Sequence, residues 1–156
     1  MDLTGALTWA RPSRVSMKWE LKKGDDVIGA MSPPHTFGTS VTASFGADGY
    51  NIRKGGIRHS GAAIWKVGSE DKLATMVVGS LGKDTVIAQD GSTYQLSQLG
   101  SPDDWILSTA DGKDIFSVHR ETAGKKPGGV VDVKSPDPHL SELLLLCWFV
   151  ISTSER

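Results

Sequence analysis

A run of nine consecutive apolar residues, Leu143 to Ile151, constrains the fold of this 156-residue chain more than any other feature. A helix that is apolar on all sides must be buried, and a bilayer-spanning helix needs about 20 apolar residues. The preceding residues favour a helix, because Asp137 can cap its first amides and Pro138 suits its first position. Short apolar runs also fit a central strand, but the cap and the leucines favour a buried helix over about 138–153.

The rest of the chain is typical of short strands separated by turns. Residues Val15 to Leu21 alternate apolar and polar side chains, as a half-buried strand does. Asp90-Gly91 and Asp111-Gly112 are strong hairpin signals. Strands are expected at 15–21, 27–31, 41–45, 50–54, 57–59, 62–67, 73–78, 85–88, 93–96, 105–107, 114–119 and 130–133. Strands at this spacing predict a mainly β sandwich or barrel, and a closed antiparallel barrel is the natural container for a buried helix.

The first residues show no clear periodicity. We therefore expect a loosely ordered segment at 1–14, followed by a single barrel domain at 15–156. Trp9 lies in this segment, where it could be an exposed aromatic that touches a membrane or a partner. The alternative is that Trp9 folds back onto the barrel, and general burial statistics favour that alternative.

Composition excludes several classes of function. The net charge is −1, with 17 basic and 18 acidic residues, whereas nucleic-acid binders usually carry a basic excess. One cysteine, Cys147, allows no internal disulfide and suits a reducing cytoplasm. We expect no signal peptide and no transmembrane segment. The four histidines lack metal-ligand spacing and no G-x-S-x-G elbow is present, so we expect no metal, no cofactor and no catalytic residues.

The densest basic cluster comprises Arg53, Lys54, Arg58 and His59. Such a group can hold a phosphate through charge-assisted hydrogen bonds. It can equally be a solvated strand edge, where charge discourages aggregation, and this second interpretation is the commoner one. If the chain binds an anion, Arg53, Lys54 and Arg58 are the candidate ligand-binding residues.

Three features together resemble a known family. Aromatic residues begin the repeated strand-turn-strand units, at Trp19, Tyr50 and Trp105. Glycines occupy the turns, at Gly24, Gly91 and Gly112. An acidic residue followed by a leucine-rich segment comes near the C-terminus, at 137–151. Over about residues 15–153 the chain resembles the tubby-like C-terminal domain superfamily, and in particular its LURP-one-related members. The resemblance implies a barrel of about twelve antiparallel strands around a central hydrophobic helix.

The resemblance also implies possible functions. Relatives include tubby proteins, which bind phosphatidylinositol phosphate headgroups, and phospholipid scramblases. This chain has no evident lipidation site or calcium-binding segment, which argues against lipid transport. We expect a non-enzymatic binding or scaffold domain that is cytoplasmic or peripheral to a membrane and that recognises anionic phospholipid headgroups. Two alternatives are a protein-interaction module that uses an exposed sheet edge and a small-molecule enzyme with a pocket at the barrel rim.

Overall fold

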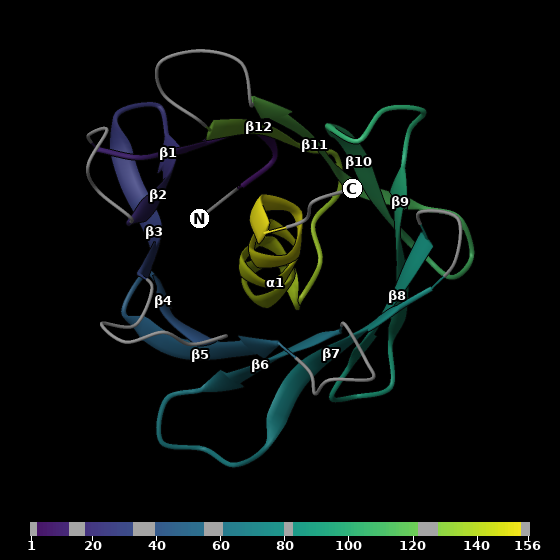
Figure 1. The fold of residues 1–156 in the computed structure, drawn as a ribbon, viewed down its shortest axis with the longest axis horizontal. Coiled ribbons are helices and arrows are strands. Elements are labelled where there is room, and N and C mark those ends of the chain that lie inside the picture. The colour runs from purple at the N-terminus through teal and green to yellow at the C-terminus, as the bar shows by residue number, and fades with distance from the viewer. Residues whose placement is uncertain are drawn as a thin grey trace.

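The computed structural model describes residues 3–12, 18–32, 40–54, 61–79, 83–121 and 128–153. Within these ranges the chain forms a closed barrel of twelve antiparallel strands, with a helix along its axis (Figure 1). This architecture confirms the predicted fold class.

Each strand pairs with its neighbours in sequence, and the first strand pairs with the last. The strands are β1 (Gly5–Ala10), β2 (Trp19–Lys23), β3 (Asp26–Ser32), β4 (Ser40–Phe45), β5 (Asp48–Lys54), β6 (Ala62–Lys66), β7 (Lys72–Val78), β8 (Lys83–Ala88), β9 (Thr93–Gln98), β10 (Asp104–Thr109), β11 (Asp114–Glu121) and β12 (Gly128–Val133). Pairing of β1 with β12 runs from Gly5 opposite Val133 to Ala10 opposite Gly128. Every described strand therefore has two neighbours, so none of them presents a free sheet edge to a partner.

Alternating side chains explain why these segments form a barrel wall. In β8, Asp84, Val86 and Ala88 are buried, whereas the residues between them are exposed. The inward side chains of all twelve strands meet the central helix in one hydrophobic core. The outward side chains form a mostly polar surface, as the period of two requires.

The helix α1 (Leu140–Thr153) fills the barrel, and every residue from Leu143 to Phe149 is buried. Its start is held by Asp137, whose carboxylate accepts hydrogen bonds from the His139 amide at 2.8 Å and from the Tyr94 hydroxyl at 2.9 Å. The predicted helix and its cap are confirmed, and the alternative of a central strand is wrong.

The expectation of a loosely ordered segment at 1–14 is wrong for residues 5–10, which form β1 and close the barrel. Leu7 and Trp9 point inward, and Trp9 is only 1% exposed. The Trp9 ring stacks on that of Trp148, with centroids 5.5 Å apart and planes 6° apart. Trp9 is thus a core residue, and its folding back onto the barrel is confirmed.

Close packing of the helix against the wall depends on Gly129 in β12. A Cβ atom at this position would lie 2.6 Å from the Trp148 ring, so any side chain would push the indole away.

Residues 13–17 and 57–59 lie outside the described part of the chain. The strand expected at 15–21 is therefore seen only from Trp19, and the one expected at 57–59 is untested.

Candidate functional site

The outer wall of β5, β6 and β7 carries a tryptophan between two cations. Arg53 of β5 and Lys72 of β7 flank Trp65 of β6, and the Arg53 guanidinium carbon and the Lys72 Nζ each lie 5.8 Å from its ring centre. Both cations are exposed, and Trp65 is half-buried. We call Arg53, Trp65 and Lys72 the basic–aromatic face. Cations at this distance from an indole are attracted to its ring.

A β-bulge places Lys72 on this face. The register between β6 and β7 shifts between Ile64 and Trp65, so that Trp65 lies opposite Lys72. The adjacent Leu73 packs against the core. The bulge therefore keeps an apolar side chain inside while the lysine stays outside beside the indole, which is a common use of bulges.

Exposed apolar side chains lie on the neighbouring wall. Val77 of β7 is 50% exposed and Ile87 of β8 is 43% exposed. Ile87 lies in the same cross-strand row as Arg53, separated from it by the small residues Ala63 and Thr75. The wall thus combines cations, an indole and aliphatic groups.

The structure describes two of the three residues predicted to bind an anion, Arg53 and Lys54. Arg53 and Lys54 are both exposed, but alternation along β5 directs them to opposite sides of the strand. Lys54 shares the side of the inward residues Tyr50 and Ile52 and lies at the end of the barrel wall. Arg58 and the neighbouring His59 lie outside the described residues. The structure thus brings Arg53 beside Lys72 rather than beside Lys54.

Trp65 and Lys72 were not identified from the sequence. Lys72 follows Arg53 by 19 positions, and only the β5–β6–β7 pairing brings them together. Hairpin pairing of the expected strands at 50–54, 62–67 and 73–78 could have suggested it, but the bulge that fixes the outward side of Lys72 leaves no clear mark in the sequence.

The two cations of the basic–aromatic face form no ion pair with any acid among the described residues. No ion pair to Arg53, Lys54 or Lys72 occurs within the described ranges, whereas Lys66 at the end of β6 pairs with Asp48 at 3.5 Å. Arg53 and Lys72 remain available to an anionic group from outside. A phosphate could accept hydrogen bonds from both.

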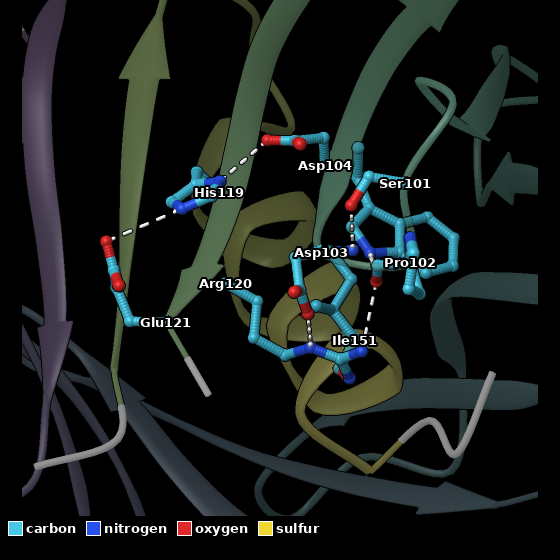
Figure 2. A network of polar contacts seen from close by, with 9 residues as sticks. Ser101, Pro102, Asp103, Asp104, His119, Arg120, Glu121 and Ile151 are labelled. Carbon is cyan, nitrogen blue, oxygen red and sulfur yellow. Dashed lines mark hydrogen bonds and ion pairs between the residues drawn. The ribbon is translucent and has the colours of Figure 1, made fainter. Parts of the chain in front are cut away.

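A second polar region lies on the outer wall of β10, β11 and β12. His119 is held between two carboxylates (Figure 2): its Nδ1 lies 2.7 Å from Asp104 Oδ1, and its Nε2 lies 3.4 Å from Glu121 Oε1. These residues border a groove of about 360 Å³, lined by Leu99, Asp104, Trp105, Ser117, Val118, His119, Val130 and Asp132. Because Nε2 faces Glu121, His119 is not placed to activate Ser117 as a nucleophile.

The hydrogen bond that the His119 ring donates to the Asp104 carboxylate raises the pKa of His119. A raised folded-state pKa contributes stability below the ordinary histidine pKa, and that contribution is lost as the pH rises through the raised value. We expect His119→Gln to lower the free energy of unfolding at about pH 5 and to have little effect at about pH 8. Both partners are largely exposed, so the difference at about pH 5 should stay below about 1 kcal/mol. Urea titrations at both pH values measure it, and equal losses at both would contradict this role.

Arg120, next to His119 in β11, anchors the end of the helix (Figure 2). Its Nη1 donates to the Ile151 carbonyl at 2.6 Å, its Nη2 donates to the Pro102 carbonyl at 3.0 Å, and its Nε donates to Asp103 Oδ1 at 3.1 Å. The side chain is only 11% exposed. These contacts satisfy a terminal helix carbonyl and oppose the negative end of the helix dipole, so the role of Arg120 is structural.

The opposite end of the helix has its own pocket of about 310 Å³, lined by Leu3, Thr4, Phe45, Pro136, Asp137, Pro138, Leu140 and Ser141. Asp137, the charged residue among its described lining, already serves as the helix cap. Beside it, burial raises the pKa of Glu142. Within the described ranges, no group of three or more His, Cys, Asp or Glu side chains is arranged to hold a metal ion. Burial raises the pKa of the Cys147 thiol inside the core, which leaves it unreactive.

Comparisons with family models, with curated proteins and with solved structures found no match to this chain. In the described part of the chain, no helix has both the length and the apolar character to cross a membrane.

Proposed function

We propose that this barrel is a non-enzymatic binding or scaffold domain that recognises anionic phospholipid headgroups at a membrane surface. The observation that carries the proposal is the basic–aromatic face, where Arg53 and Lys72 flank Trp65 without a neutralising acid among the described residues. Their two charges can attract a headgroup phosphate. Each basic residue near an anionic membrane surface contributes about 1 kcal/mol to the free energy of binding.

The composition of this wall supports a membrane surface as the source of the phosphate. Indole side chains favour the boundary between water and lipid, because one end is polar and the rest is apolar. The exposed Val77 and Ile87 on the adjoining strands can contact acyl chains. A tubby-like identity, proposed from the sequence resemblance, agrees with a barrel around an axial helix. In this proposal the protein is cytoplasmic and peripheral to the membrane.

Vesicle binding tests the proposal. The protein should co-sediment with phosphatidylcholine vesicles that contain phosphatidylserine or phosphatidylinositol phosphates, and salt should weaken this binding. Replacing both cations, in Arg53→Gln/Lys72→Gln, should weaken it about 30-fold, since two contacts of about 1 kcal/mol each are lost.

The matched control neutralises two exposed lysines on the other side of the barrel, in Lys113→Gln/Lys134→Gln. This variant carries the same change in net charge and should bind within about twofold of the wild type, because charges beyond a Debye length contribute little. Equal losses in both variants, or wild-type binding to pure phosphatidylcholine, would reject a specific role for the basic–aromatic face.

A further inference from the structure

The groove on β10–β12 has a chemistry opposite to that of the basic–aromatic face. Asp104 and Asp132 line it, and Glu121 lies at its border beside His119. Among the described residues, none that line the groove is lysine or arginine, although Lys134, outside the lining, contacts Asp132 at 3.8 Å. The two surfaces lie on opposite sides of the barrel (Figure 1), so a ligand at one leaves the other accessible.

Apolar side chains complete the groove. Leu99 is 54% exposed and Val130 is 43% exposed, and both line the groove. Cross-strand pairing places Val130 directly opposite His119, which in turn lies opposite Asp104. On the adjacent row, Asp132 lies opposite Ser117. Leu99 lies opposite Asp104 on the other side, so Leu99 and Val130 stand at the two ends of one row, with Asp104 and His119 between them. A peptide can therefore place an apolar side chain at each end of the row and a cationic side chain against Asp104.

We propose that this groove binds a lysine or arginine side chain presented by a protein partner. These side chains combine an aliphatic stem, which packs on apolar surface, with a cationic head. Leu99 and Val130 lie three strands apart, so the stem would lie beside one of them and a neighbouring apolar side chain of the partner would lie against the other. The cationic head would meet Asp104 between them, with Asp132 on the adjacent row. A carboxylate-lined groove repels anionic lipid, so its occupant differs from that of the basic–aromatic face. Because the closed barrel offers no strand edge among its described strands, a protein partner must be recognised through side chains in this way.

His119 makes this binding depend on pH. The groups that act on it are Asp104 from β10, Glu121 from its own strand and Asp103 from the turn before β10. From β12, Asp132 lines the same groove and contacts Lys134 at 3.8 Å. When His119 is protonated, its charge occupies Asp104 and opposes an incoming cation. The partner should therefore bind more tightly as the pH rises through the raised pKa of His119, and His119→Gln should remove most of that dependence.

The test follows the methyl NMR signals of Leu99 and Val130 in the full chain during titration with synthetic peptides. The probes are short peptides with one central lysine or arginine between leucines and valines, and matched peptides carry norleucine or citrulline at that position. Free Nα-acetyl-lysine methylamide forms a third arm. We expect the cationic peptides to shift both signals to saturation, with affinity rising between about pH 5.5 and about pH 8.

The variant Asp104→Asn/Asp132→Asn should weaken the cationic peptides at least about tenfold, because hydrogen bonds to charged groups are each worth about 1.5–3 kcal/mol. Arg53→Gln/Lys72→Gln serves as the control and should bind them as the wild type does, which separates this proposal from lipid binding. Three outcomes would overturn it: no peptide shifts these signals, the neutral peptides bind equally well, or the free amine binds as tightly as the peptides.

Discussion

Replacing Leu145 with aspartate is expected to unfold the protein. Leu145 is 0% exposed and lies at the middle of α1, surrounded by the barrel wall. Taking a carboxylate into such a site without a partner costs several kcal/mol, and the lost packing of leucine adds about 2–5 kcal/mol. The sum is comparable to the whole stability of an ordinary domain, about 5–15 kcal/mol. Circular dichroism and urea titration at neutral pH measure the loss.

The matched control is Val67→Asp, because Val67 is 59% exposed in the turn after β6. Introducing the same charge there should change the free energy of unfolding by no more than about 0.5 kcal/mol. A Leu145→Asp protein that keeps its strand spectrum and its cooperative transition would show that the helix does not fill the barrel.

Replacing Arg120 with methionine should produce the second-largest loss, about 2–4 kcal/mol. The change removes the donor to the Ile151 carbonyl and leaves the Asp103 carboxylate, 31% exposed, without its cation. The stability of Arg120→Lys should lie between those of the wild type and Arg120→Met. One ammonium cannot reproduce the forked geometry that reaches Asp103, Pro102 and Ile151 together.

Lys134→Met serves as the control for loss of an ion pair. Lys134 contacts Asp132 at 3.8 Å with both side chains largely exposed, so its removal should cost less than about 1 kcal/mol. Urea midpoints and slopes of the three variants compare these effects directly. If Arg120→Met were no less stable than Lys134→Met, the contacts to the helix end would not contribute to stability.

Local patterns in the sequence predicted the parts of the fold that depend on neighbouring residues. The capped apolar run identified α1, and Asp-Gly turns identified the β8–β9 and β10–β11 hairpins. The strand β1 was missed because only Leu7 and Trp9 mark its inward side. Its place is decided by pairing with β12, more than 100 residues later, and no local rule contains that information.

The candidate sites were harder to predict for the same reason. Arg53 stood out because it lies in a basic cluster, but Lys54, its neighbour in sequence, projects to the other side of β5. Trp65 and Lys72 become its neighbours only through two strand pairings and a bulge. Likewise, His119 meets Asp104 only because β11 pairs with β10 in that register. A set of side chains on a barrel wall is defined by register, which periodicity alone leaves open.

The order of elements along the chain also has a consequence for biosynthesis. A ribosome produces all twelve strands before it produces α1, yet α1 occupies the middle of the folded molecule. The β1–β12 seam joins segments more than 100 residues apart, and such non-local contacts form slowly. The nascent strands must therefore remain open, or reopen, until the last segment leaves the exit tunnel. During that interval their unpaired edges and apolar faces are available to chaperones and vulnerable to aggregation.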